Sequence, residues 1–207
     1  MSFPTNFGIK EVADVRFYNT TDVTYDKSNG TIAIAKGADH VLEFTTLKVS
    51  NIEFTAETTE AKGGKGNAAL ISWDHSREIN ITLEDALLSL DCMRKMFTKG
   101  TGTGAVTVGA GDFPGNYAIV GVTFARDSEG TGDSLFTFFV PNAKISSDFS
   151  LTMEADGDPT VFSMSVKALR ATKTDDTMIA FIPGDNLTNI TLTENENYLD
   201  KVVTKTT

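Results

Sequence analysis

Cysteine and histidine are nearly absent from this chain. Cys92 is the only cysteine among 207 residues, and His40 and His75 are the only histidines. One cysteine cannot form an internal disulfide, and neither a cysteine cluster nor a His-x-x-x-His pair is present to bind zinc. We therefore expect a protein made in a reducing cytoplasm, without a metal site or cofactor, whose stability comes from packing or assembly.

Long apolar runs and an excess of basic residues are missing as well. No stretch is long and apolar enough to span a bilayer, and residues 1–6 lack the basic start and apolar run of a secretion signal. Lys and Arg number 18 against 28 Asp and Glu, a formal net charge of −10. Such a surface repels phosphate backbones. We expect no membrane partner and no ordinary nucleic-acid binding.

What is present is the pattern of a folded, mainly β protein. Hydrophobic residues make up 40% of the chain and charged residues 22%, so we expect one domain over residues 1–207, with an extended N-terminal segment and a polar C-terminal tail. Turn-forming residues at 26–30, 127–133 and 156–159 indicate hairpin connections. Segments that alternate with the period of a strand are clearest at three places: Phe136/Phe138/Val140, Phe149/Leu151/Met153 and Phe162/Met164/Val166.

A long hairpin is predicted over about residues 41–81. The apolar phase between Val41 and Glu60 slips twice, which indicates bulges or bends in the first strand. A flexible glycine-rich connection follows, and the strand pattern resumes from Leu70 through Trp73 to Ile81. The connection, which we expect to form a mobile tip, consists of Ala61, Lys62, Gly63, Gly64, Lys65, Gly66 and Asn67.

One α-helix is predicted over about residues 82–99. Thr82 and Asp85 resemble a capping box, and basic residues followed by Gly100 are typical of a helix end. One apolar stripe would pack this helix on a sheet; it comprises Leu83, Ala86, Leu87, Leu90, Met93 and Phe97.

Three segments contain residue types found in active sites, but each has a simpler interpretation. Asp74-His75-Ser76 has the components of a hydrolytic triad, yet neighbouring strand residues point to opposite faces. The glycine-rich segment with Lys62 and Lys65 lacks the Ser or Thr of a phosphate loop. Asp156-Gly157-Asp158 lacks the further ligands of a calcium loop and is typical of a turn. We predict no catalytic, cofactor-binding or metal-binding residues, and no enzyme activity.

The order of these elements resembles the tail-tube proteins of long-tailed bacteriophages. The long hairpin, the strand with Trp73, the helix and the strand with Phe139 to Ile145 follow one another, and residues 147–164 are similar to the closing hairpin of such virion proteins. The resemblance spans roughly Val41 to Ala168. It implies a β-sandwich or barrel with a flanking helix, six copies joined through edge strands into a ring, and rings stacked through long loops.

The resemblance also implies a function and a location. The chain would be a structural protein of the virion tail, made in the bacterial host cytoplasm, with copies of itself and other tail proteins as partners. Viral DNA would pass through an acidic lumen without specific binding. Residues Ala61 to Asn67 are the candidate ring-to-ring contact, although an ordinary exposed hairpin tip fits them equally well. The alternatives are a β-sandwich module that binds carbohydrate or protein, or another structural component of the phage.

Overall fold

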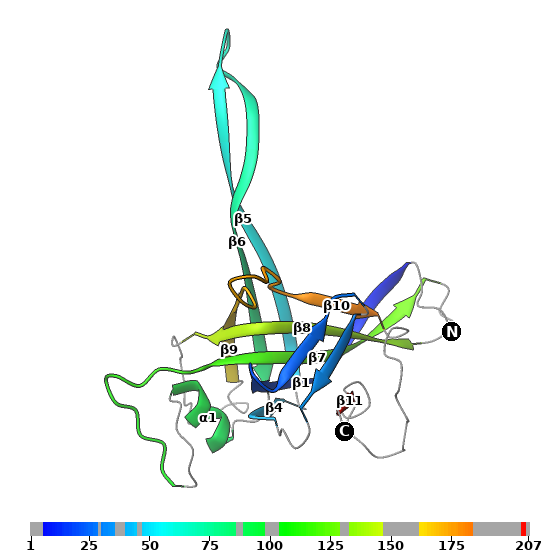
Figure 1. Ribbon diagram of the computed structural model, residues 1–207, viewed down its shortest axis with the longest axis vertical. Coiled ribbons are helices and arrows are strands. Elements are labelled where there is room, and N and C mark those ends of the chain that lie inside the picture. Colours follow the sequence, from blue (N-terminus) through cyan, green and yellow to red (C-terminus); the bar gives the residue numbers. More distant parts are fainter. Residues whose placement is uncertain are drawn as a thin grey trace, which may run out of the picture.

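The computed structural model consists mainly of antiparallel β-structure (Figure 1). It describes residues 6–28, 30–35, 40–44, 47–85, 89–97, 104–128, 133–146, 162–183 and 204–205. The β-strands are β1 (Phe7–Asn19), β2 (Val23–Asp26), β3 (Thr31–Ile34), β4 (Leu42–Phe44), β5 (Leu47–Gly63), β6 (Ala68–Asp85), β7 (Asn116–Asp127), β8 (Asp133–Ile145), β9 (Phe162–Leu169), β10 (Ala180–Pro183) and β11 (Thr204–Lys205). The mainly β fold with one described helix is thereby confirmed.

The larger sheet divides at β8. Its strands follow the order β4-β1-β7-β8-β9-β6-β5, and β10 also pairs with β8. Because β7 pairs with β8 along most of its length, β9 and β10 must share the opposite edge of β8. The β9 strand pairs with residues 142–145, and β10 pairs with residues 136–139. The sheet therefore continues in two directions from one strand.

The central strands bury side chains on both faces. Along β7, Tyr117 and Ile119 belong to one hydrophobic cluster, whereas Ala118, Val120 and Val122 belong to a second. The first cluster lies against β6, β9 and the helix, and the second is covered by the β2–β3 hairpin and Ile182 of β10. The alternation of strand side chains thus supplies two cores from one set of strands.

The N-terminal segment contributes a central strand. The β1 strand lies between β4 and β7 and pairs with β7 from Phe7 to Asn19. Val15 and Phe17, which are fully buried, enter the first core. Near the other end of the chain, β11 runs parallel to β3. The alternating residues Phe162, Met164 and Val166 lie in β9, as predicted. The rest of the predicted closing hairpin, residues 147–161 with the alternating residues 149–153 and the turn at 156–159, lies outside the described residues.

The helix is shorter than the sequence pattern predicts. The structure has β-strand up to Asp85, and α1 begins at Leu90 and ends at Phe97. The prediction of helix from Thr82 was wrong because Ile81, Leu83 and Asp85 continue the alternation of β6 and are buried against neighbouring strands. The capping residue is instead Ser89, whose Oγ accepts a hydrogen bond from the Cys92 amide at 3.0 Å.

An exposed ion pair links the turn after β2 to the segment before β10. The Lys27 Nζ lies 2.6 Å from Asp175 Oδ1. The hydrogen bond from Lys27, followed by those from Thr177, lowers the pKa of Asp175 from 3.8 to about 2. Because the folded-state pKa is lowered, the stabilisation is present above pH 3.8 and is lost as the pH falls towards about 2.

Replacing Asp175 should therefore have a pH-dependent effect. We expect Asp175→Asn to lower the unfolding midpoint slightly at pH 7, since the pair is exposed and screened. The difference from wild type should shrink below pH 3.8. Urea unfolding from neutral to acidic pH measures it, and Lys27→Gln should show the same trend. A difference that stays constant across the acidic range would contradict the assignment.

Candidate functional site: an exposed arm and an apolar groove

The β5–β6 hairpin projects from the body of the protein (Figure 1). We call its outer part, residues 55–78, the arm. Every arm residue is exposed except Gly63, which is half-buried, although this part of the hairpin remains a paired ribbon. The predicted long hairpin is confirmed with shifted bounds, because β5 starts at Leu47 and residues 42–44 form β4. An isolated two-stranded ribbon is at best marginally stable in water.

A β-bulge marks the point where the arm leaves the sheet. Thr55 pairs with Glu78 and Glu57 pairs with His75, so β6 contains one extra residue there. Ser76, within this bulge, has a φ of 54°, which is uncommon for a residue other than glycine. A second irregularity lies between Leu47 and Val49. The irregularity between Leu47 and Val49 confirms a predicted bulge in the first strand of the hairpin. The bulge at Ser76 lies in β6, where it separates the base of the hairpin from the exposed arm.

The tip of the arm is a four-residue turn. Of the predicted connection, Ala61 to Gly63 belong to β5, and the turn comprises Gly64 to Asn67. The Asn67 amide donates a hydrogen bond to the Gly64 carbonyl at 3.2 Å. Gly64 and Gly66 have φ values of 78° and 90°, which side chains rarely adopt. The glycines therefore serve a tight turn, and a strand rather than a helix follows Lys65, unlike in a phosphate loop.

Large apolar side chains project from the outer half of the arm. The exposed fraction is 70% for Leu70, 62% for Ile71 and 48% for Trp73. Trp73 lies opposite Thr59 and Ile71 lies opposite Ala61, so these four residues share one face of the ribbon. Contiguous exposed apolar side chains mark interaction surfaces in soluble proteins.

The Asp74-His75-Ser76 segment lies on the arm and does not form a hydrolytic triad. The bulge brings Ser76 Oγ within 3.1 Å of His75 Nδ1, so the expectation that these two side chains lie apart was wrong. Glu57 Oε2 lies 3.5 Å from the same Nδ1, while Thr59 Oγ1 lies 2.6 Å from His75 Nε2. A triad places its serine and carboxylate on opposite ring nitrogens. Asp74 instead accepts a hydrogen bond from Thr58.

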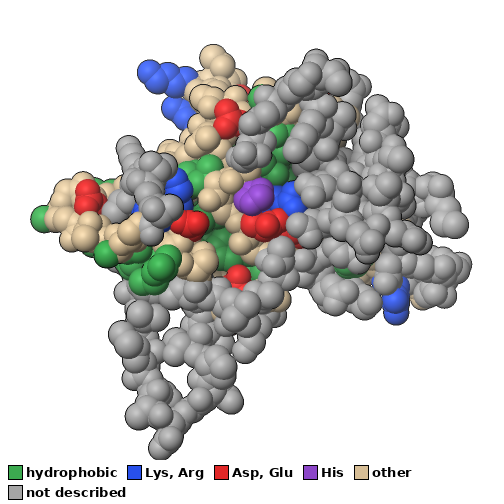
Figure 2. Space-filling view, turned by 90° about the horizontal axis from the view of Figure 1, so that it is seen from below, with side chains coloured by type: hydrophobic (Ala, Val, Ile, Leu, Met, Phe, Trp, Pro, Cys, Tyr) green, Lys and Arg blue, Asp and Glu red, His purple; other side chains and the backbone are tan. Residues whose placement is uncertain are grey.

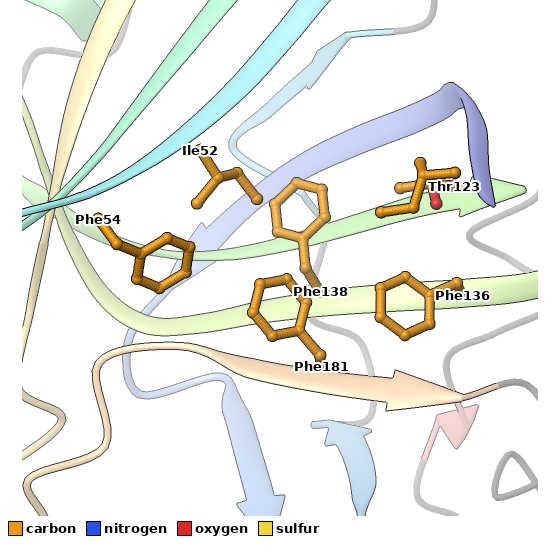
Figure 3. A pocket seen from close by; sticks show the side chains of 7 residues that line it. Ile52, Phe54, Thr123, Phe136, Phe138 and Phe181 are labelled. Carbon is orange, nitrogen blue, oxygen red and sulfur yellow. The ribbon is translucent and has the colours of Figure 1, made fainter. Parts of the chain in front are cut away.

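An apolar groove lies at the base of the arm, where the sheet divides (Figure 3). It encloses about 280 Å³. The rings of Phe136 and Phe181 stack with their centroids 5.8 Å apart, and the ring centroid of Phe54 lies 6.3 Å from that of Phe181. The lining residues come from five strands: Ile9, Ile52, Phe54, Thr123, Phe136, Phe138 and Phe181.

The groove escaped the sequence analysis. Phe136 and Phe138 were assigned to a strand, which is confirmed, but their neighbours in the groove are distant in the sequence. Ile9 and Phe181 are 59% and 44% exposed. An alternating strand pattern does not distinguish a ring that fills a core from one that lines an open groove. Only the pairing of β10 with β8 brings Phe181 to this place.

The remaining candidate groups have structural surroundings. Cys92 is buried, and burial, together with the nearby Asp85, raises the pKa of its thiol to about 12. This is the predicted buried thiol. Among the described residues, no group of three or more His, Cys, Asp or Glu side chains could hold a metal ion. The Asp156-Gly157-Asp158 segment lies outside the described residues. No helix in the described part of the chain is long and apolar enough to cross a membrane.

Acidic side chains are distributed rather than clustered on the face seen in Figure 2. There, Asp and Glu side chains lie among Lys, Arg and exposed apolar side chains. Some acidic side chains form ion pairs: Glu43 Oε1 lies 2.6 Å from Arg16 Nη2, and Glu78 Oε1 lies 2.6 Å from Lys167 Nζ. The described acidic side chains seen on this face therefore do not form one continuous acidic patch.

Comparison with known proteins identifies the family. The family model described as YomU/Tube protein family matches residues 7–101 and 96–182. These segments include both the arm and the groove. No curated protein matches the sequence. The matched segments cover most of the chain, so it belongs to the YomU/Tube protein family, which confirms the predicted resemblance to bacteriophage tail-tube proteins and indicates a structural role.

Proposed function

We propose that the chain is a subunit that assembles into six-membered rings, and that the rings stack into the tail tube through which phage DNA passes. The observation that carries this proposal is the arm. A ribbon exposed on both faces, with Leu70, Ile71 and Trp73 uncovered, is a poor end state for a monomer but suits a subunit covered by its neighbours.

Edge strands support the same proposal. The β5 strand ends the path of the larger sheet, and the arm portion of β6 extends beyond β9, which pairs only with residues 80–85. Strand edges that carry free backbone groups promote pairing with another chain, and closure into a ring covers them. Assembly would thus use surfaces that otherwise favour aggregation.

The tip and the charge have roles in this proposal. The turn and its flanks, Ala61 to Asn67, form the far end of the arm, which suits a contact between successive rings. The net charge of −10 would let DNA slide through the lumen, because like charges prevent tight binding of phosphates. Other tail proteins would cap the tube at its ends. The chain would be made in the host cytoplasm before entering the virion.

Electron microscopy of the purified protein over a concentration series tests the proposal. We expect hollow rings or tubes, and light scattering should show their mass rising with protein concentration. Seeding with tail-tip complexes should promote tubes if initiation is slow. A monomer at every concentration, even with seeds, would overturn the proposal and favour a β-sandwich module that binds a ligand. Such a module would show ligand-dependent melting instead.

A further inference from the structure

We propose that the apolar face of the arm, formed by Ile71 and Trp73, inserts into the groove of a neighbouring copy. This inference rests on the proposed self-assembly and names the contact that would drive it. The donor is an outer segment of β6, and the acceptor is the groove between the base of β5, the β8 strand and β10. Each copy would give one arm and receive another.

Most of the exposed large apolar side chains in the described part of the chain lie at these two places, whereas Leu90, Val108 and Phe113 lie elsewhere. Leu70, Ile71 and Trp73 lie on the arm. Phe54, Phe181 and Ile9 line the groove, and Phe7, whose ring lies 5.4 Å from that of Phe136, extends its rim. Two apolar surfaces on one chain, both exposed to solvent, lower their free energy by covering each other.

The arm cannot fill the groove of its own chain. Thr59, the partner of Trp73, lies five residues beyond Phe54 along β5, which is about 17 Å of extended strand. The arm is a paired ribbon that projects from the body, so it holds its apolar side chains at this distance from its own groove (Figure 1). A second copy is therefore the occupant that we propose.

The size and chemistry of the groove suit an indole. A cavity of about 150 Å³ holds a benzene molecule, and the groove encloses about 280 Å³. That volume is just below the usual range of small-molecule pockets, about 300 to 1,000 Å³. Four phenylalanines line it, so it offers aromatic faces and edges to an inserted ring. Buried aromatic anchors of this kind dominate the energy of many interfaces.

The arm and the groove are different surfaces of one chain, so two arrangements satisfy the contact: two copies exchange arms about a two-fold axis, or each copy gives its arm to the next in a heterologous contact. The proposed rings require the heterologous arrangement. It leaves a free arm at one end and a free groove at the other until a ring closes or a filament grows. A closed dimer with exchanged arms would therefore contradict the proposed ring.

Trp73 is the only tryptophan in the chain, so its fluorescence reports the proposed insertion directly. We expect its emission to shift to shorter wavelength as tubes form. Phe181→Ser should raise the protein concentration needed for both changes by about tenfold or more, as when a buried aromatic anchor is removed. The matched control is Phe113→Ser, which alters another exposed phenylalanine that does not line the groove.

The outcomes separate this inference from the proposed function. Tubes that form with unchanged Trp73 emission, or equal effects of Phe181→Ser and Phe113→Ser, would overturn the inference and leave the tube subunit standing. Absence of any tube would overturn both. A shift of Trp73 emission that accompanies tube formation, and that requires a higher protein concentration in Phe181→Ser but not in Phe113→Ser, would support the insertion.

Disulfide trapping provides a second measurement that retains Trp73 and Phe181. Thr59 lies beside Trp73 on the arm face, and Ile9 lies in the groove wall. We expect the double variant Thr59→Cys/Ile9→Cys to give a ladder of covalent oligomers on oxidation. Thr58→Cys/Ile9→Cys, which uses the opposite arm face, should give none. Buried Cys92 should not compete. Tubes without the ladder, or equal ladders from both variants, would contradict the inference.

Discussion

Replacing residues 58–74 by an Asn-Gly turn should leave a folded monomer that no longer forms rings or tubes. Glu57 and His75 are paired across the hairpin, so a two-residue turn can join them at this point. The deleted segment is exposed except for half-buried Gly63 and contributes no residue to either core. Far-ultraviolet circular dichroism and the melting temperature should therefore remain close to those of the wild-type monomer.

A shorter tip provides the control for this truncation. Gly63 and Ala68 are also paired, so Asn-Gly can replace residues 64–67 while the rest of the arm is kept. If the tip joins successive rings, this variant should form single rings without long tubes under the microscope. If the truncated protein, lacking residues 58–74, still assembles at wild-type concentrations, the arm is not the assembly element and the proposed function loses its main support.

Local patterns predicted the long hairpin because its signals lie within one stretch of sequence. Alternating residues on both strands, glycines at the tip and the two shifts in the apolar alternation can all be found in the residues themselves.

The predicted start of the helix was wrong because two local patterns overlap there. Thr82 and Asp85 satisfy a capping rule, but Ile81 and Leu83 also satisfy the strand period, and pairing with β5 and β9 decides between them. Tertiary contacts, which the local pattern does not contain, settled the boundary.

The groove could not be predicted because no single segment carries it. Its residues come from β1, β5, β7, β8 and β10, and their meeting depends on β9 and β10 sharing one edge of β8. The sequence identified Phe136 and Phe138 as strand residues facing inward, but it gave no reason to bring Phe181 or Ile9 beside them. The sequence pattern also did not locate the bulge at Ser76. This bulge brings the His75 and Ser76 side chains together, although strand alternation predicts that they lie on opposite faces.

Gly121→Ala should cause the largest loss of stability of any single substitution considered. Gly121 is buried in β7 and lies opposite Phe138 of β8. A Cβ at this position would lie 2.1 Å from Cζ of the Phe138 ring. That ring is buried in the first core and also lines the groove. Such overpacking typically costs about 1–3 kcal/mol and occasionally more, a large share of the roughly 5–15 kcal/mol that stabilises a typical domain.

Gly8→Ala is the matched control for this substitution. Gly8 also lies in a strand, but nothing lies within 4 Å of the Cβ it would gain. Urea unfolding of the monomer, followed by circular dichroism, should show a large drop in the midpoint for Gly121→Ala and little change for Gly8→Ala. Equal effects of the two variants would show that the Phe138 ring does not set the cost, because reduced backbone freedom in the unfolded chain favours folding at both positions.

The same substitution connects the core to assembly. If the new methyl group pushes the Phe138 ring outward, the ring enters the space that the groove leaves open. Gly121→Ala protein that remains folded should then assemble poorly, and Phe138→Leu in the same chain should restore part of both stability and assembly, because the smaller side chain relieves the clash. Restored stability without restored assembly would mean that the groove is not the surface that receives the neighbouring arm.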